Sequence, residues 1–449
     1  MARNRVIYQS QAVYASQTAF DGALTASGAV VALERVQSAN YSFSVARQDV
    51  NQFGELAAID RIIIDTPTVS FDTSYYVNGF GNEEALGFEV TPSGGNGNTF
   101  TSCISGIINT ATAANQKNYF ILTTKEGADA AGLSAVNKTG DYESIIGIGN
   151  GFVTSYSTEA SVGGLPTASV SVEGQNMNFV NVPIKPGENV AQTDGGLQPS
   201  NLTGCGFRLA PTPTAGLSQS GITYISGISP AVNATNGNKI NQNVALPVYS
   251  GNSTLQNVIS SLRPGDITFG LRAHDSTQTI TNTYLDGFFA GGAVPTVTDD
   301  LIQGADIKDA HIQSYNVSFD LSRTPIERLG SRFAFARVVD FPITSSLSID
   351  AVLSDLTTGN IADFINCDES YDALITMKAA GDCNVVGDKP QVCNILLRKL
   401  KLDSESFTSS IGDNKSVTLD FSNQIGGPEQ TDVGIFMSGV NFINPNRGY

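Results

Sequence analysis

The side chains that most often carry catalysis or bind metals are sparse in this sequence. It has two histidines, His274 and His311, which lie in different contexts with no nearby cysteine or second histidine. A histidine that acts as a base or as a metal ligand usually has a neighbour that orients its ring or shares the metal. We therefore expect both histidines to be structural or surface residues.

The five cysteines do not form a recognisable site either. They contain no CxxC pair, and only the last two lie close together, ten residues apart: Cys103, Cys205, Cys367, Cys383 and Cys393. Zinc sites and disulfide frameworks need closely spaced or regularly repeated cysteines. The sequence thus predicts neither a metal site nor a set of disulfides.

The segment Gly147-Ile-Gly-Asn-Gly151 has the closely spaced glycines of a phosphate-binding loop. Such a loop needs a following helix whose N-terminus faces the phosphate. Here the chain continues into a predicted strand at Val153, so we interpret the glycines as backbone flexibility before that strand.

Two groups of acidic residues could bind a cation, but neither has the spacing of a calcium loop. They are Asp299-Asp300 and the group Asp363, Asp368 and Glu369. The sequence also contains no GxSxG, Walker or HExxH motif. We therefore expect a protein that is not an enzyme and that uses no cofactor and no metal.

The composition favours a β-rich protein that does not grip nucleic acid. The chain has 449 residues, of which only 15% are charged, and its net charge is −17. The polar residues are mainly Ser, Thr and Asn, accompanied by 45 glycines. Binding DNA through its phosphates needs Lys and Arg to displace counterions. No apolar run approaches the roughly 20 residues of a membrane span, and no secretory signal is apparent, so we expect a soluble product of the cytoplasm without membrane insertion.

An internal repeat divides the chain. Residues 36–61 align without a gap on residues 312–337, at an offset of 276, with nine identities in 26 positions. The first copy contributes Gln37, Ser38, Asn40, Ser42, Phe43, Arg47, Gly54, Ala58 and Arg61 to these identities. Further along, four residues between 155 and 163 match residues between 404 and 412 at an offset of 249. One domain is thus used twice.

Each copy contains two segments with a period of two, which is the period of a half-buried strand. They begin at Val36, Val153, Ile312 and Leu402. Each segment is followed by a candidate hairpin partner, at 68–72, 167–173, 346–350 and 416–422. Longer hairpin tips are expected at 47–58 and 323–336.

The polar positions of these strands define one predicted face. The four first strands contribute Ser38, Asn40, Ser42, Ser44, Ser155, Ser157, Glu159, Ser161, Ser314, Asn316, Ser318, Asp320, Ser404, Ser406, Thr408 and Ser410. Their partners add the acids Asp72, Glu173, Asp350 and Asp420 among further Ser and Thr. Across 30 polar positions there are six acids and no Lys or Arg. Solvated sheet faces usually mix both signs, so this face suits the inner wall of a wide, water-filled barrel. A Ser-rich outer face of a β-sandwich is the alternative.

We divide the chain into an N-terminal arm (1–29), a first copy (30–182), a connector or inserted β-rich region (183–305), a second copy (306–425) and a C-terminal arm (426–449). Short helices are expected near 82–86, 125–133 and 355–364. A structureless connector of this length would be unusual. We therefore expect further strands within it, for example at 221–226 and 266–271.

Four segments of the two copies carry a family resemblance. The segments 36–45, 61–67, 161–174 and 337–342 resemble the major tail tube protein of tailed bacteriophages. The resemblance covers the two copies and leaves 183–305 unexplained. It implies two tandem β-sandwich domains whose long hairpins join those of neighbours in a large intermolecular β-barrel, with short flanking helices.

The resemblance also implies a function and partners. The chain would be a structural virion protein, assembled in the host cytoplasm, whose stacked homo-oligomeric rings let DNA pass without binding it specifically. Most members of the family form sixfold rings of single domains, so a duplicated chain predicts trimeric, pseudo-sixfold rings. Tape-measure, tail terminator and baseplate or tip proteins are the other expected partners. A β-rich virion decoration protein or adhesin, and a polysaccharide-processing virion enzyme, are the rival hypotheses.

Overall fold

The fold was analysed in a computed structural model, which is mainly β. It describes residues 11–16, 30–64, 68–77, 79–92, 100–108, 117–124, 142–174, 176–180, 262, 264–281, 284–285, 288, 311–326, 329, 336–352, 370–378, 391–408, 416–427 and 430–439. Within these residues no helix is long and apolar enough to cross a membrane.

Most of the strands belong to one 16-stranded sheet. The strands of its first half are β1 (Gln11–Ser16), β2 (Val30–Ala32), β3 (Val36–Ser44), β6 (Thr68–Tyr76), β7 (Val90–Pro92), β8 (Lys117–Thr124), β9 (Tyr142–Ser161), β10 (Thr167–Gly174) and β11 (Asn176–Val180). Those of its second half are β12 (Ile267–Ala273), β13 (His311–Asp320), β16 (Ile343–Val352), β17 (Tyr371–Lys378), β18 (Gln391–Thr408), β19 (Ser416–Ile425) and β20 (Gly434–Gly439).

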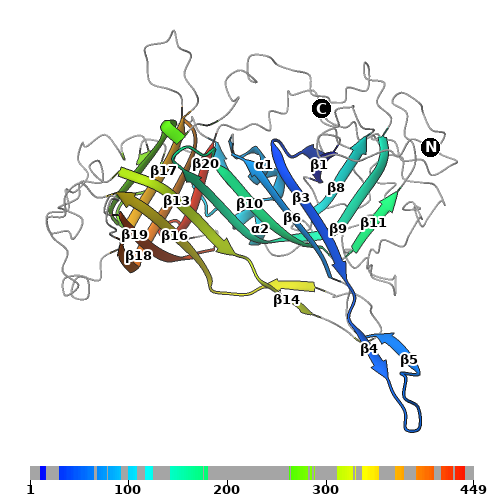
Figure 1. Cartoon of the computed structure of the whole chain (residues 1–449). Coiled ribbons are helices and arrows are strands. Elements are labelled where there is room, and N and C mark those ends of the chain that lie inside the picture. Colours follow the sequence, from blue (N-terminus) through cyan, green and yellow to red (C-terminus); the bar gives the residue numbers. More distant parts are fainter. Residues whose placement is uncertain are drawn as a thin grey trace, which may run out of the picture.

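Eight of these strands form the central part of the sheet, in the order β3-β6-β10-β9-β13-β16-β19-β18 (Figure 1). The first four come from the first half of the chain and the last four from the second half. The two sets of four strands are arranged in the same order. In that order β13 corresponds to β3, β16 to β6, β19 to β10 and β18 to β9. The two halves meet where β9 pairs antiparallel with β13.

The irregularities of the sheet recur in the same way. The β3–β6 ladder shifts register between Val36 and Ser38, and the β13–β16 ladder shifts between Ile312 and Ser314. Likewise, the β9–β10 ladder shifts register between Val153 and Ser155, and the β18–β19 ladder shifts between Leu402 and Ser404. β-Bulges are specific features of a fold. The two halves therefore share strand order and bulge positions.

The strands β9 and β18 are long enough to take part in two sets of pairings. The early residues of β9 pair with β8 and β11, and its later residues pair with β10 and β13. β18 pairs first with β17 and β20 and then with β19. The apolar sides of both halves contribute to one core cluster that includes Phe71, Tyr156, Phe319 and Phe421.

Two short hairpins extend from the strands of the central part. They are β4 (Arg47–Val50) with β5 (Asp60–Ile63), and β14 (Arg323–Ile326) with β15 (Ala336–Val339). We call them the first arm and the second arm. Figure 1 shows the first arm projecting from the end of β3, away from the other strands.

The helices of the described part of the chain are short. They include α1 (Gly81–Leu86) and α2 (Ser105–Ile108). α1 ends because Gly87 adopts a left-handed conformation (φ 105°), which lets its N–H bond back to the carbonyl of Glu83 at 3.0 Å.

The mainly β fold class and the four hairpins predicted from the period of two are confirmed. The helix near 82–86 and the strand near 266–271 are also present, as α1 and β12. The predicted elements at 125–133, 221–226 and 355–364 lie outside the described residues. β12 comes from the predicted connector and pairs with β17 of the second half. The domain boundaries and the duplication remain predictions.

The interpretation of Gly147–Gly151 as a segment before a strand was wrong. β9 already begins at Tyr142, so these glycines lie within it. A Cβ atom on Gly151 would come within 2.7 Å of the Tyr119 ring and 2.9 Å of the Val172 side chain. The absence of a side chain at this glycine therefore permits close packing of β9 against its neighbours.

Candidate functional site

The eight central strands bring the predicted polar residues together on one face, which we call the polar face. Ladder registers connect it without interruption from β3 to β18. Ser42 lies opposite Ser70, Asp72 opposite Ser171, and Ser157 opposite both Ser169 and Ser318. The rows continue through Ser318–Ser346, Ser348–Asp420 and Asp420–Ser404. Because side chains alternate along a strand, a register that pairs polar with polar positions keeps all of them on the same side.

Side-chain burial follows the same alternation. In β6 the residues Val69, Phe71, Thr73 and Tyr75 are buried, whereas the residues between them are half-buried or exposed. β16 shows the same pattern, with buried Leu347 and Ile349 beside exposed or half-buried serines. The hydroxyl groups thus lie on the accessible side of the sheet, and the apolar groups lie in the core.

Hydroxyl groups on the polar face bond to one another across the strands. The Ser38 and Ser74 hydroxyls are 2.6 Å apart, those of Ser42 and Ser70 are 2.7 Å apart, and those of Ser318 and Ser346 are 2.8 Å apart. Such pairs contribute a fraction of a kcal/mol each, roughly 0.2–1 kcal/mol. Their main effect here is to hold a smooth surface of short, neutral side chains.

The acids of the polar face accept hydrogen bonds from neighbouring hydroxyls. Asp350 accepts from Ser314 at 2.7 Å and from Thr418 at 2.6 Å. Asp420 accepts from Ser348 and Ser404, both at 2.7 Å, and these bonds lower its pKa. Hydrogen bonds to the charged form favour that form. Asp420 therefore stays ionised at neutral pH, and the face carries negative charge.

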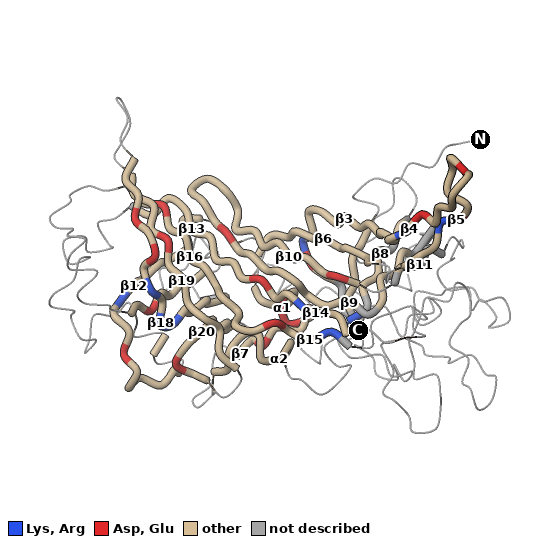
Figure 2. The backbone as a smooth tube through the Cα atoms, turned by 90° about the horizontal axis from the view of Figure 1, so that it is seen from below, with Lys and Arg blue, Asp and Glu red and all other residues tan. Residues whose placement is uncertain are grey.

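The other predicted acids take part in the same network or border it. Asp72 accepts from Ser171 at 2.7 Å, and Glu159 lies near Thr167 at 3.3 Å and Asn316 at 3.4 Å. Figure 2 shows acidic positions spread over the strands of the face.

The structure places the remaining predicted residues on the same strands. Asn40, Ser44, Ser155, Ser161, Asp320, Ser406 and Thr408 lie on β3, β9, β13 and β18 at the expected register positions. Ser410 lies outside the described residues.

Two basic residues lie at the margin of the polar face. Lys401 pairs with Ser422 because the register shift between Leu402 and Ser404 changes the parity of β18. Arg337, from the second arm, forms an ion pair with Glu173 at 2.6 Å. The 30 predicted positions contain no basic residue. The β-bulge in β18 and the second arm nevertheless bring Lys401 and Arg337 to the border of the polar face.

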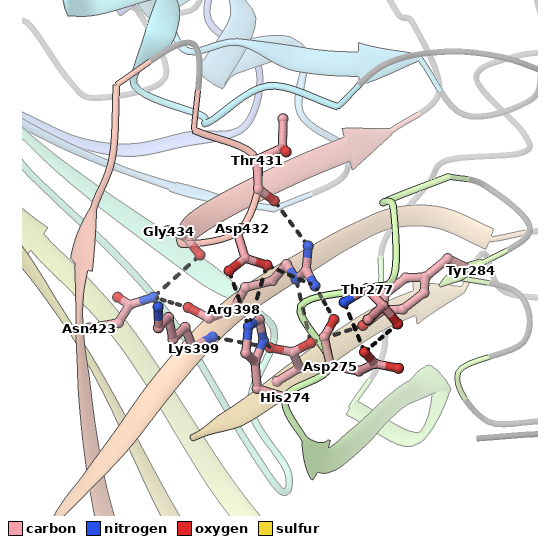
Figure 3. Close-up of polar contacts among 11 residues, drawn as sticks. His274, Asp275, Thr277, Tyr284, Arg398, Lys399, Asn423, Thr431, Asp432 and Gly434 are labelled. Carbon is pink, nitrogen blue, oxygen red and sulfur yellow. Dashed lines mark hydrogen bonds and ion pairs between the residues drawn. The ribbon is translucent and has the colours of Figure 1, made fainter. Parts of the chain in front are cut away.

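A second cluster, which the sequence did not predict, lies around His274 (Figure 3). The His274 ring contacts Asp372 through Nδ1 at 2.7 Å and Asp432 through Nε2 at 3.4 Å. The Tyr284 hydroxyl donates to Asp372 at 2.9 Å. Arg398 contacts both carboxylates, each at 3.4 Å. The acids lie far from His274 in sequence, so no local pattern could have shown the cluster.

We interpret this cluster as one that stabilises the fold. The hydrogen bond to Asp372 is the main cause that raises the pKa of His274 above its ordinary value. Arg398 also donates to the carbonyls of Thr431 at 3.0 Å and Asp275 at 2.8 Å. The cluster thereby fixes two segments beside β17 and β18, near residues 274–284 and 430–434. Unlike the sequence neighbourhood, the fold gives His274 partners that orient its ring, and its structural role remains a prediction.

A third group lies deep in the core. Glu83 of α1 is fully buried and accepts hydrogen bonds from the hydroxyls of Tyr75 at 2.9 Å and Tyr156 at 3.0 Å. Burial raises the pKa of Glu83 to about 7. This raised pKa resembles that of a general acid, but the side chain has no exposed surface from which to reach a substrate. We therefore interpret Glu83 as a core residue.

Among the residues that the structure describes, no group of three or more His, Cys, Asp or Glu side chains is arranged so that it could hold a metal ion. Cys103 and Cys393 are buried free thiols, and burial raises the pKa of each, so neither resembles a reactive cysteine. The other three cysteines and the two acidic groups at 299–300 and 363–369 lie outside the described residues.

Comparisons with known proteins give little further information. No protein-family model matches the chain, and no curated protein matches it. Among solved structures, it is similar to a chain of the anti-feeding prophage (AFP) baseplate, with 12% sequence identity and a TM-score of 0.20. That alignment covers 28% of this chain and 78% of the other.

Proposed function

We propose that this chain is a structural virion protein of a phage tail, and that its polar face forms part of the inner wall of the tail tube. The observation that carries the proposal is the continuous polar face of eight strands. Its hydroxyls bond to each other or to acids, and its 30 predicted positions include no Lys or Arg. The resemblance in sequence to tail tube proteins supports the same interpretation.

The charge of the face suits a conduit for DNA. Duplex DNA carries about one phosphate charge per 1.7 Å of axis, so rings of Lys or Arg would hold it by releasing counterions. Ionised Asp420 and hydrogen-bonded Asp72 and Asp350 repel phosphates instead. Salt screens this repulsion beyond roughly 10 Å at 0.1 M. A DNA molecule would pass such a wall without binding to it.

The size of the face is compatible with a tube. In the proposed trimeric ring, three copies of the eight central strands close one barrel. With strands about 4.8 Å apart and tilted by about 40°, its backbone diameter is roughly 50 Å. The two halves of each chain would act as two of six similar units. The shared strand order and bulge positions support this pseudo-sixfold arrangement and the duplication that it requires.

The two arms are our candidates for contacts between stacked rings. Phe53 and Leu56 at the tip of the first arm are fully exposed, as is Leu329 of the second arm. Exposed apolar side chains gathered at one place usually mark an interaction site. Tape-measure, tail terminator and baseplate proteins are the other partners in this proposal.

The rival functions fit the described residues less well. A decoration protein or adhesin is expected to have sheet faces that carry both acidic and basic residues. At the predicted positions of the polar face, the charged residues are all acidic. A glycan-cleaving enzyme needs an accessible carboxyl of raised pKa beside a second carboxylate. Glu83 has a raised pKa but is buried. Burial also raises the pKa values of Glu84 and Glu89, which are accessible and interact with each other. Our preference for a tube protein therefore rests on the polar face and not on the lack of such a pair. We propose a role without catalysis.

Negative-stain electron microscopy of the purified protein tests this function directly. Tubes or rings with a central bore are the expected result, and cross-sections should show three chains per ring. Compact particles without a bore would contradict the proposal. Rings of six whole chains would contradict the trimeric arrangement alone.

A further inference from the structure

The two strands that join the halves of the chain, β9 and β13, each have a counterpart at an outer edge of the eight central strands. Within the chain, β9 and β13 pair so that Ser155 lies opposite Asp320, Ser157 opposite Ser318, and Glu159 opposite Asn316. In the order of strands, β18 holds the place of β9, and β3 holds the place of β13. In the part of the chain that the structure describes, residues 401–408 of β18 pair only with β19, and β3 pairs only with β6.

Aromatic side chains are exposed on both of these edges. Phe319 of β13 is 3% exposed at the internal joint, where its ring lies 5.5 Å from that of Tyr156. Its counterpart on β3, Phe43, is 63% exposed. On β18, Phe407 is 47% exposed, whereas its counterpart Thr158 on β9 is fully buried. The internal joint thus covers the positions that the two outer edges leave accessible.

The edge on β3 lacks the usual protection against strand pairing. Natural edge strands are commonly blocked by Lys, Pro or inward-facing charges. Residues 36–44 of β3 contain no charged residue and no Pro. Residues 402–408 of β18 contain no Lys, Arg or Pro, but Glu405 places one charge on the apolar side of that edge. A strand that pairs with β18 must therefore accommodate the Glu405 carboxylate.

We infer that β18 of one copy pairs antiparallel with β3 of a second copy, in the register that joins β9 to β13 within the chain. The sequence offsets of 249 and 276 transfer that register. They place Ser404 opposite Ser44, Ser406 opposite Ser42, and Thr408 opposite Asn40. On the apolar side, Phe407 comes to lie opposite Tyr41, and Glu405 opposite Phe43.

This inference rests on the proposed function, because it names the residues that join one copy to the next. The partner is a second copy of the chain, since the two edges match each other through the internal joint. In this register the polar face continues from copy to copy, and Phe43 and Phe407 become covered. In the inferred register Glu405 is the one polar side chain of these pairs on the apolar side, whereas a register shifted by one residue would place the serines there as well.

The test is cysteine cross-linking of the assembled protein. The variant S406C/S42C carries thiols at positions that are opposed across the inferred joint. The matched control, S406C/S38C, keeps both thiols on the polar face but moves one by four residues, roughly 13 Å along β3. The single variants S406C and S42C report the background from the native cysteines. Assembly of every variant is checked by electron microscopy before oxidation.

We expect S406C/S42C to give at least ten times more cross-linked dimer than the control. Assembled particles that cross-link equally well or better in S406C/S38C would overturn the register, although the proposed function would stand. Wild-type protein that stays monomeric would overturn the proposed function, and the inferred joint with it.

Discussion

Phe43 and Phe319 occupy equivalent positions on β3 and β13, yet the first is 63% exposed and the second is 3% exposed. Phe319 packs against the rings of Tyr156 and Phe88, with centroids 5.5 Å and 6.0 Å away. The difference arises because β13 has β9 beside it, whereas β3 is an edge strand in the described part of the chain. The same residue type therefore stabilises the monomer at one position and is available to a partner at the other.

This difference predicts that replacing Phe by Ser affects folding stability at one position and assembly at the other. F319S should destabilise the monomer by about 3–5 kcal/mol, as loss of a buried phenyl group does. F43S should change the free energy of unfolding by less than about 0.5 kcal/mol but should weaken assembly. Urea unfolding and sedimentation velocity measure the two properties. Equal stability losses in both variants would contradict the assignment of Phe43 to an intermolecular surface.

Introducing positive charge on the polar face should make it retain DNA. S42K/S318K replaces two equivalent serines, and we expect the assembled tubes to bind duplex DNA with an affinity that falls steeply with salt. Wild-type tubes should show no such binding, and virions with the variant should eject DNA more slowly. The control is S42N/S318N, which enlarges the same two polar side chains without adding charge. Unchanged binding and ejection in S42K/S318K would argue against an inner wall.

Burial of Glu83 predicts a dependence of stability on pH. Its pKa is about 7 in the folded chain against an ordinary value of 4.5, so the folded state holds the proton more tightly. This contribution is fully present below pH 4.5 and is lost as pH rises through about 7. The difference corresponds to roughly 3 kcal/mol. Urea denaturation between pH 5 and 8 should show the decline, and E83Q should flatten it.

The His274 cluster predicts a change of the same sign by a separate route. Its hydrogen bond with Asp372 raises the pKa of His274, so protonated His274 stabilises the fold. This contribution is present below the ordinary pKa of histidine and disappears as pH rises through the raised value. H274Q should remove it while leaving the Glu83 effect intact. NMR titration of the His274 ring in wild-type protein measures the shift, and an ordinary or lowered pKa would refute it.

The first arm should matter for stacking and not for folding. Phe53 and Leu56 have fully exposed side chains, so F53S/L56S should leave the unfolding midpoint within experimental error. We expect single rings in place of tubes by electron microscopy. The matched variant V69S replaces a residue that is 2% exposed in β6 and should destabilise the fold instead. Long tubes formed by F53S/L56S would exclude the arm tip as a ring contact.

The sequence was sufficient for the parts of the fold that depend on local alternation. The hairpins from β3 to β6 and from β13 to β16 follow from a period of two, since polar and apolar residues alternate over most of each strand. The early residues of β9 could not be predicted in this way, because glycines at 147, 149 and 151 carry no side chain to show a face.

The sites divide in the same manner. The polar face could be predicted because its members recur at fixed intervals within each strand. The cluster of His274, Asp372 and Asp432 could not, because its contacts span 98 and 158 residues of sequence. The exposure of Phe43 and Phe407 was also missed. Their apolar side of the strand was expected to be packed, and only the strand order shows that they lie on edges.

The long strands β9 and β18 have a mechanical consequence. Each runs without a break from the pairings beside the core to the pairings of the polar face, over 20 and 18 residues. A load applied to the polar face is therefore transmitted along the same backbone into the most buried ladders, where many hydrogen bonds resist it in shear. No loop interrupts this path, and the β-bulges beside Ser155 and Ser404 are the places where the two strands can bend. Bending of the polar face relative to the core should accordingly be concentrated at these two bulges.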